Sequence, residues 1–293
     1  DVLDPVSNRN YATAAAGQKE DIDLAVAAAR EAFTNGPWPK MKPRERARVL
    51  NKIADAVEAQ EARLAELETF DTGLPITQAK GQALRAAENF RFFADLIVAQ
   101  FDDAMKVPGS QINYVNRKPI GVAGLITPWN TPFMLESWKL APALATGNTV
   151  VLKPAEFTPL SASLWATIFK EAGLPDGVFN LVNGLGEEAG DALVKHPDVP
   201  LISFTGETTT GRLISQYASQ NLIPVTLELG GKSPNIFFND VAQANDTFYD
   251  KAQEGFALFA FNQGEVCTCP SRALVQEDIY DSFMADAVAR VEK

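Results

Sequence analysis

The sequence predicts an α/β fold: a helical N-terminal segment, a parallel sheet covered by helices on both faces, and the start of a second α/β unit. After residue 120, short continuous apolar runs alternate with amphipathic helical stretches, a pattern typical of βαβ units. The first hundred residues instead carry apolar side chains at helical spacing. These two patterns of apolar residues divide the chain into a helical part and a part built on a sheet.

Three helices are expected in the first third of the chain. The first covers residues 21–33 with one apolar stripe, and the second runs from Pro43 until Thr72-Gly73 ends it. The third covers about 77–100, and its phenylalanines are expected to pack in the core. The stripe of the first helix consists of Ile22, Ala25, Ala29 and Phe33, and the phenylalanines of the third are Phe90, Phe92 and Phe93.

Extended segments follow. Residues 111–119 alternate in polarity and predict an exposed ribbon that is a plausible subunit contact. Parallel strands are predicted at 121–126, 148–153, 178–182, 201–204 and 225–229, with helical stretches at 158–172 and 187–195 among them. A second series then brings a strand at 234–238, a helix over 245–262, a strand at 272–276 and a helix from 278. Ligands of such sheets bind at the carboxyl ends of the strands.

Composition excludes several classes of protein. Lys and Arg number 26 against 37 Asp and Glu, and the net charge of -11 argues against a nucleic-acid partner. Hydrophobic residues make up 46% and charged residues 22%, which excludes a disordered chain. No apolar run approaches the roughly 18–20 residues of a membrane helix.

The two cysteines, Cys267 and Cys269, lie one residue apart. This spacing is a poor disulfide framework, so it does not imply an oxidising compartment. No signal peptide is visible at the N-terminus. We therefore expect a soluble, cytoplasmic protein.

Cys267 is the candidate nucleophile. It follows a glycine-bearing segment and precedes Arg272 by five residues. A nearby cation or a helix end promotes the thiolate form, which is the nucleophilic one. An inert buried cysteine is the alternative, and we assign that role to Cys269, because two such close thiols can scarcely both point into one site.

Two polar residues at predicted strand ends could serve the same chemistry. Glu228 lies near the end of an apolar strand, where a carboxylate is costly unless paired or protonated, the setting of a tuned general base. An ordinary structural ion pair is the alternative. Asn130 follows the strand at 121–126 and could present its amide to a developing oxyanion, or else be a turn residue or helix cap.

Other segments fit a nucleotide. Lys153 and Glu156 lie together at the end of a predicted strand and could hydrogen-bond ribose hydroxyls, one donating and the other accepting. Residues 204–211, FTGETTTG, open a helix and suit a phosphate or nicotinamide-side contact at its N-terminus. Residues 184–190, GLGEEAG, resemble a dinucleotide fingerprint, but the third glycine falls one residue late and two glutamates would repel a pyrophosphate.

The lone histidine and the acidic residues offer no metal chemistry. His196 is expected at a helix end or in a loop. No His/Cys/Asp/Glu cluster has metal-ligand spacing, so no metal site is expected.

The order of five segments is more specific than any one of them. TPWN, VLKPAE, FTGETTTG, LELGGKSPN and NQGEVC, spread over residues 127–272, resemble the NAD(P)-dependent aldehyde dehydrogenase superfamily. Residues 1–211 resemble semialdehyde and betaine aldehyde types. The later stretches QNLIPVTLELGGKSPNIFF and FALFAFNQGEVCTCPSR are closer to bacterial acetaldehyde or lactaldehyde dehydrogenases.

The resemblance implies the domain organisation of that fold. Residues 1–107 would be the helical part of the NAD-binding domain and 108–120 a ribbon for oligomerisation. Residues 121–230 would form the Rossmann-like cofactor domain, and 231–293 the beginning of the catalytic domain. A homo-oligomer, dimer or tetramer, is implied as well.

The resemblance also implies oxidation of an aldehyde to a carboxylic acid. Cys267 would attack the carbonyl, and the Asn130 amide and the Cys267 backbone N–H would hold the oxyanion. Glu228 would activate the water that hydrolyses the resulting thioester. The implied cofactor contacts are Ile126, Thr127, Pro128, Trp129, Lys153, Glu156, Gly186, Gly206, Glu207, Gly211 and Leu229.

The cofactor implied is NAD rather than NADP. In the family pattern Lys153 and Glu156 face the adenosine ribose. A carboxylate there accepts from free hydroxyls and repels a 2′-phosphate. Many members carry Ser where this chain has Glu207, and others carry Glu.

Two rival interpretations stay open. In the family a long stretch follows the nucleophile, including a Glu-x-Phe-Gly-Pro segment, whereas this sequence ends at Lys293. We therefore expect a C-terminally truncated form of the fold, and a non-catalytic cofactor-binding fragment is the first rival. The second rival is a CoA-acylating dehydrogenase. The presence of Glu228 argues against this second rival, because a CoA-acylating enzyme does not need a general base to activate water.

Overall fold

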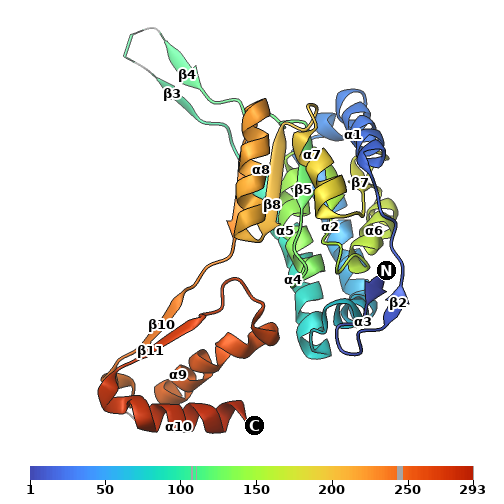
Figure 1. The fold of residues 1–293 in the computed structure, drawn as a ribbon. Coiled ribbons are helices and arrows are strands. Elements are labelled where there is room, and N and C mark those ends of the chain that lie inside the picture. The colour runs from blue at the N-terminus through green and yellow to red at the C-terminus, as the bar shows by residue number, and fades with distance from the viewer. Residues whose placement is uncertain (107, 110, 243–246, 293) are drawn as a thin grey trace. The chain divides into compact units, whose positions relative to one another are not determined.

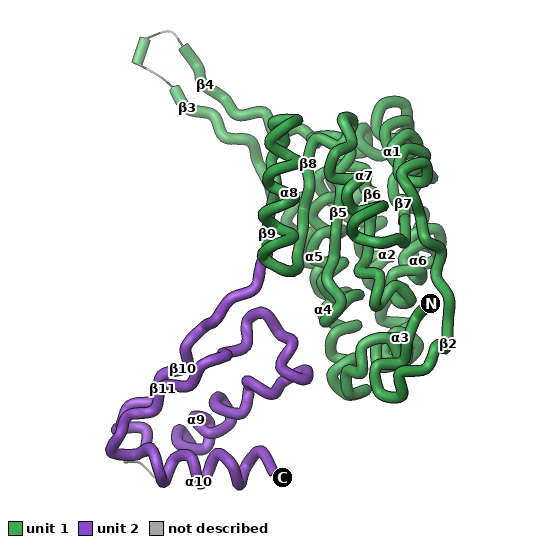
Figure 2. The backbone as a smooth tube through the Cα atoms, in the orientation of Figure 1, with its two compact units in different colours: residues 1–228 green, residues 229–293 purple. Residues whose placement is uncertain are grey.

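The computed structural model of the protein describes residues 1–106, 108–109, 111–242 and 247–292. These residues fold as two compact units, Asp1–Glu228 and Leu229–Lys293 (Figure 2). Each unit has a sheet and a hydrophobic core of its own.

The first unit is built on a five-stranded sheet with the order β7-β6-β5-β8-β9. β5 pairs in parallel with β6 and β8, and β6 pairs in parallel with β7. The strands are β5 Val122–Ile126, β6 Thr149–Lys153, β7 Phe179–Leu181, β8 Leu201–Gly206 and β9 Val225–Leu229. They coincide closely with the five predicted runs, which confirms the predicted α/β fold.

Helices cover both faces of this sheet (Figure 1). One face carries α1 Lys19–Thr34, α7 Asp191–Lys195 and α8 Thr208–Asn221. The other carries α5 Pro132–Ala145 and α6 Leu164–Ala172, backed by α2 Pro43–Ala59, α3 Glu61–Thr72 and α4 Ile76–Ala99. Short 3-10 helices lie at Trp38–Lys40 and Ser161–Ser163, and a π-helical turn at Gly186–Gly190 leads into α7.

An aromatic stack forms part of the core between the sheet and the second layer of helices. The rings of Phe133 and Trp165 lie parallel, with centroids 3.9 Å apart, and Phe169 stacks on the other side at 5.1 Å. The ring of Phe90 of α4 completes the group, with its centroid 5.4 Å from that of Trp165. All four side chains are buried, so this stack holds α4, α5 and α6 together.

Three details of the helical prediction are wrong. The predicted second helix is two helices that meet at Gln60, which leaves the helical backbone so that α2 and α3 can both pack on α4. In α1 the buried stripe runs through Val26 and Ala32 rather than Ala25 and Phe33. Phe92 is 60% exposed, because it lies on the face of α4 opposite Phe90.

The predicted ribbon is an antiparallel pair. β3 Ala104–Lys106 pairs with β4 Ile112–Tyr114, so the ribbon starts before residue 108, and residues 107 and 110 lie outside the described residues. Figure 1 shows the course of β3 and β4. The apolar side chains Met105, Ile112 and Tyr114 of this ribbon are exposed. At the N-terminus, β1 Val2–Leu3 and β2 Asn10–Ala12 form a second antiparallel pair.

The second unit contains a two-stranded parallel sheet of β10 Pro234–Phe237 and β11 Arg272–Val275. α9 Thr247–Ala257 connects the strands and α10 Tyr280–Val291 follows them, with 3-10 helices at Asn239–Ala242, Leu258–Gly264 and Glu277–Ile279. Phe237, Ile279 and Phe283 form its core. The predicted helix 245–262 is therefore shorter, and its residues 245–246 lie outside the described residues.

Within the described part of the chain, no helix combines the length and the apolar character needed to cross a membrane.

Candidate active site and cofactor pocket

The carboxyl ends of β5 and β8 open into a pocket of about 470 Å³ in the first unit. Its walls are mostly apolar and come from the strand ends and from α7 and α8. The lining residues are Ile126, Gly186, Glu187, Gly190, Asp191, Val194, Lys195, Phe204, Thr210, Leu213, Ile214 and Tyr217. Of these, Ile126 and Gly186 were predicted individually from the sequence, and Phe204 and Thr210 lie in the predicted contact segment 204–211. The lining residues of α7, and Leu213, Ile214 and Tyr217 of α8, were missed because their spacing looks like that of ordinary amphipathic helices.

Lys153, Glu156 and Gly186 meet near this pocket. Lys153 ends β6 and is 2% exposed, and its Nζ lies 2.6 Å from Glu156 Oε2. A Cβ on Gly186 would lie 3.8 Å from Glu156 Oε1, an ordinary van der Waals distance, so the backbone at Gly186 lies beside the carboxylate. Burial raises the pKa of Glu156, but the hydrogen bond and charge of Lys153 outweigh it, and the pKa is lowered. The Glu156 carboxyl group is therefore ionised at neutral pH.

Asn130 lies in the turn that joins β5 to α5. Its side chain is buried, and Oδ1 accepts a hydrogen bond from the Thr131 backbone N–H at 3.1 Å. This bond orients the amide, so that Nδ2 is its donating end. No side-chain cap of α5 is formed, and Thr131 occupies the N-cap position. Thr127 and Pro128 are buried in the same turn, while Trp129 is exposed.

The N-terminus of α8 is occupied by a carboxylate of the chain itself. Glu207 is the N-cap residue, and its Oε2 accepts from the N–H groups of Thr209 at 2.6 Å and Thr210 at 3.0 Å. These bonds, first the one from Thr210, lower the pKa of Glu207. In this geometry an anion at the helix end would meet the Glu207 carboxylate, so of the two predicted contacts the geometry favours the nicotinamide side over the phosphate, and both stay predictions. Gly206 has no room for a Cβ, which would lie 2.6 Å from the Phe204 ring.

Glu228 lies on β9 and is exposed. The expectation of a desolvated carboxylate is wrong here, because β9 is the edge strand of the sheet and alternates between half-buried and exposed residues. A carboxylate on such a strand keeps its water.

Lys139 of α5 is a buried residue that sequence reasoning missed. Its Nζ donates to Ser203 Oγ at 2.9 Å, and Thr226 Oγ1 lies 2.7 Å from the same oxygen. Burial lowers the pKa of Lys139 to about 8, while the charge of Glu228 acts in the opposite direction. Its spacing on α5 resembles an ordinary surface lysine, so no local signal reveals its burial.

Cys267 belongs to the second unit and is exposed. The 3-10 segment before it, Leu258–Gly264, is interrupted by a kink, in which Asn262 and Gln263 have φ of 47° and 61°. Non-glycine residues seldom adopt this left-handed conformation. Such strain clusters at functional sites. Cys269 is partly buried, and burial, followed by the charge of Cys267, raises its pKa. The exposed thiol is therefore the one available to a substrate.

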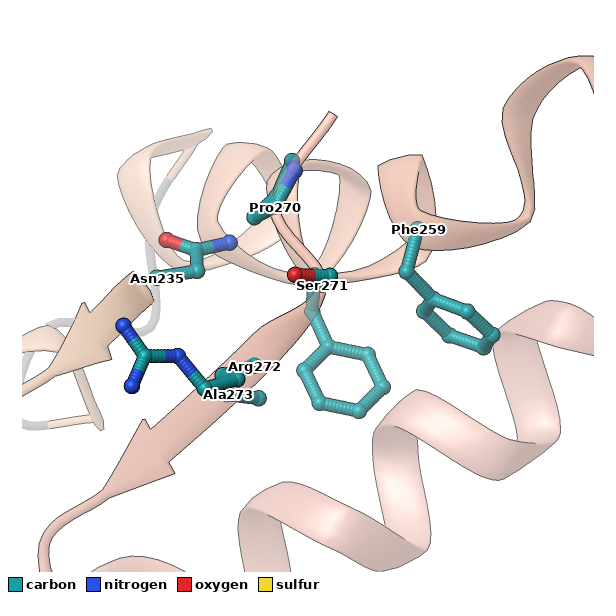
Figure 3. A pocket seen from close by; sticks show the side chains of 7 residues that line it. Asn235, Phe259, Pro270, Ser271, Arg272 and Ala273 are labelled. Atoms are coloured by element: carbon teal, nitrogen blue, oxygen red, sulfur yellow. The ribbon is translucent and has the colours of Figure 1, made fainter. Parts of the chain in front are cut away.

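A second pocket, of about 260 Å³, lies in the second unit, and residues 270–273, which follow the thiols, form part of its lining (Figure 3). Asn235 and Arg272 lie on one side of it and Phe259 on another. Asn235 Nδ2 donates to the Gly255 carbonyl at 3.0 Å. Its complete lining is Asn235, Phe256, Phe259, Pro270, Ser271, Arg272 and Ala273. Sequence reasoning singled out only Arg272 of this group.

The predicted site residues thus fall into separate groups. The cofactor set around Lys153 and the turn with Asn130 lie in the first unit, as does Glu228, whereas Cys267 lies in the second. Among the described residues, no group of three or more His, Cys, Asp or Glu side chains is arranged to hold a metal ion. His196 caps the C-terminus of α7, where its Nδ1 accepts from the Asp198 N–H at 3.1 Å.

Comparison with known proteins gives a consistent family. The model of the "Aldehyde dehydrogenase family" matches residues 1–293. Acetaldehyde dehydrogenase 2 of Cupriavidus necator is 51% identical over 98% of this chain and 56% of its own length. Fluoroacetaldehyde dehydrogenase of Streptantibioticus cattleyicolor is 53% identical, again over 98% and 56%. The chain thus spans about half the length of the curated relatives it matches.

Solved structures agree with this result. The aldehyde dehydrogenase KauB from Pseudomonas aeruginosa superposes with a TM-score of 0.95 at 41% identity, covering 100% of this chain and 59% of that one. Betaine aldehyde dehydrogenase from Staphylococcus aureus, solved in complex with NAD+, superposes with a TM-score of 0.93 at 37% identity, covering 100% and 57%.

The buried amine of Lys139 leads to a prediction about stability. Because the folded state lowers its pKa from 10.5 to about 8, the unfolded chain binds more protons between these values, and unfolding free energy rises with pH there. In the wild type, the free energy of unfolding should rise by about 1–3 kcal/mol between pH 7.5 and 10. Lys139→Met should remove this rise. Urea titration followed by tryptophan fluorescence measures this, since all four tryptophans lie in the first unit.

Lys170→Met, at an exposed position of α6, is the matched control and should keep the wild-type pH dependence. Identical pH dependence in Lys139→Met and wild type would contradict the prediction.

Proposed function

Because the chain belongs to the aldehyde dehydrogenase family, we propose that the protein oxidises an aldehyde to a carboxylic acid with NAD as the hydride acceptor. The observation that carries this proposal is the pairing of Lys153 with Glu156 beside an apolar pocket at the carboxyl ends of parallel strands. The names of the two curated relatives favour a short aliphatic aldehyde, and acetaldehyde is the first substrate to test.

The first unit has the surfaces that a dinucleotide needs. The apolar pocket between α7 and α8 suits a flat aromatic base. The ammonium of Lys153 can donate to a ribose oxygen, and the carboxylate of Glu156 can accept from a ribose hydroxyl. We assign the turn with Thr127, Pro128 and Trp129, together with Gly206, Gly211 and Leu229, to the nicotinamide side. When bound there, NAD would supply the acceptor for the hydride of the aldehyde.

Cys267 supplies the nucleophile in this proposal. Its thiolate adds to the aldehyde carbon, and the carbonyl oxygen becomes an oxyanion that Asn130 Nδ2 and the Cys267 backbone N–H stabilise. Loss of hydride leaves a thioester on Cys267. Glu228 takes a proton from water, the hydroxide adds to the thioester, and the carboxylic acid leaves as the thiol is restored.

Exposed Met105, Ile112 and Tyr114 give the ribbon of β3 and β4 an apolar surface. We propose that this surface contacts a second copy of the chain, which makes the protein a homo-oligomer.

The experiment that tests the function follows NADH absorbance with acetaldehyde and NAD, with and without CoA. NADH without CoA supports hydrolytic oxidation, and formation that requires CoA would favour the acylating alternative. No NADH from this chain alone, but NADH after addition of the C-terminal part of a relative, would identify a cofactor-binding fragment. Cys267→Ala is the control and should abolish NADH formation under every condition.

Asn130→Ala tests the oxyanion role. Loss of one such donor typically costs about 2.7–4 kcal/mol of transition-state stabilisation, so kcat should fall on the order of 10²–10³-fold. Steady-state kinetics give kcat, and circular dichroism checks that the buried position tolerates the change. A loss of less than about tenfold would argue against this role.

Glu156 tests the choice of cofactor. Repulsion between its carboxylate and a 2′-phosphate should make NAD bind about tenfold more tightly than NADP. Glu156→Gln should reduce the difference in affinity between NAD and NADP. Glu171→Gln, at an exposed position near the end of α6, should leave this difference unchanged. Quenching of tryptophan fluorescence gives both affinities without turnover. Equal affinity of the wild type for the two cofactors would refute the assignment.

A further inference from the structure

Three carboxyl groups are buried behind the turn that carries Asn130. Glu136 belongs to α5, and Glu68 and Asp71 belong to α3; their exposed fractions are 0%, 1% and 3%. None of the three takes part in an ion pair among the described residues, although ten such pairs occur elsewhere. Buried carboxylates without a cation are costly, so a structural role that uses the neutral acid is favoured.

Asp71 and Glu68 have partners of their own. Asp71 accepts from the Tyr11 hydroxyl at 2.8 Å and from the Leu160 backbone N–H at 2.9 Å. Glu68 Oε1 lies 3.4 Å from the Phe133 backbone N–H, and the Ser161 hydroxyl faces the same carboxyl group. These contacts tie α3 to the start of α5 and to the segment that follows Glu156.

Glu136 is placed differently, because it connects the core to the turn. Trp165 Nε1 donates to its Oε2 at 2.7 Å. The other oxygen, Oε1, is enclosed, as is Thr127 Oγ1, and in the described structure neither has a hydrogen bond of ordinary geometry. The Thr127 hydroxyl is nevertheless near enough to lower the pKa of Glu136. Glu136 Oε1 and Thr127 Oγ1 are thus enclosed oxygens of neighbouring groups, and each lacks a hydrogen-bond partner in the described structure. A proton shared between them would satisfy both.

We propose that Glu136 is a positioning residue whose neutral carboxyl group donates from Oε1 to Thr127 Oγ1 and thereby fixes the Thr127–Asn130 turn. The proton belongs on Oε1, because Oε2 already accepts from Trp165. The turn is then anchored to the core at Thr127 through Glu136, while Asn130 and Thr131 hydrogen-bond to each other at its other end. The consequence for catalysis rests on the proposed role of Asn130, whereas the anchoring itself does not.

Protonation at neutral pH agrees with this geometry. Burial raises the pKa of Glu136 to about 8. The hydrogen bond from Trp165 counteracts the rise, the charges of Glu68 and Asp71 add to it, and the nearby Thr127 hydroxyl counteracts it slightly. Glu68 and Asp71 are the ionisable groups whose charges raise the pKa of Glu136. Burial raises their own pKa values to about 7 and about 6. The bridge is therefore present at pH 7 and is lost as pH rises past about 8.

Hydrogen–deuterium exchange of the turn tests the proposal in the full chain. The reporting amides are Thr127, which donates to the Lys153 carbonyl at 3.2 Å, and Thr131. Glu136→Gln is the matched control, because its amide can accept from Trp165 and donate to Thr127 as the neutral acid does. We expect its exchange to stay within about twofold of wild type at pH 7.

Glu136→Leu and Thr127→Val each remove one side of the bridge, and both should accelerate exchange of the two amides by tenfold or more. After correction for intrinsic exchange, the wild type should also exchange faster at pH 9 than at pH 7, and Glu136→Gln should not. Thr127→Val preserves side-chain volume, so it keeps the test decisive if Glu136→Leu does not fold.

Wild-type exchange rates in Thr127→Val at pH 7 would overturn the proposal, as would equally strong acceleration in Glu136→Gln. Neither readout needs turnover. A wild-type chain that forms no NADH would count against the proposed function and leave the exchange results standing.

Discussion

Strands β5 and β6 are buried over their whole length, and this burial determines where the first unit can place polar side chains. Helices cover both faces of the two central strands, so a charged side chain reaches water only where a strand ends. Lys153 lies at such a strand end, because it is the last residue of β6. Its buried ammonium group is stabilised by the ion pair with Glu156, three residues later. The turn with Asn130 follows the neighbouring strand β5, at the same edge of the sheet.

Helix α5 extends this arrangement into the core. Glu136 and Lys139, one turn apart, are both buried, yet they do not pair with each other: Glu136 contacts Trp165, and Lys139 contacts Ser203 of β8. Burial raises the pKa of the acid and lowers that of the base, so it shifts both toward their neutral forms. The two groups therefore act as hydrogen-bonding groups that link α5 to its neighbours, rather than as an ion pair.

The sequence was sufficient for features that depend on local pattern. Continuous apolar runs located the five strands, and the run 148–153 placed Lys153 and Glu156 together at a strand end. The ion pair between them came only from the structure. Features that depend on position in the sheet were not predictable: Glu228 looks buried in an apolar run but lies on the edge strand β9. Glu207 looks like part of an anion site, but its own carboxylate caps α8. Glu136 has the spacing of any helical glutamate, and only tertiary packing reveals its burial.

Three glutamates follow or end strands at the carboxyl edge of the sheet, and their surroundings separate their chemistry. Glu156 is held by Lys153, and Glu207 by the N–H groups of α8; both contacts lower the pKa of the carboxyl group and make it a weaker base. A general base must also contact water. A carboxylate that is already paired with a cation or hydrogen-bonded to a helix N-terminus is a poor acceptor for a proton of that water. Glu228 is exposed on β9, near the amine of Lys139. Of the three, it is therefore the glutamate suited to activate water in the proposed reaction.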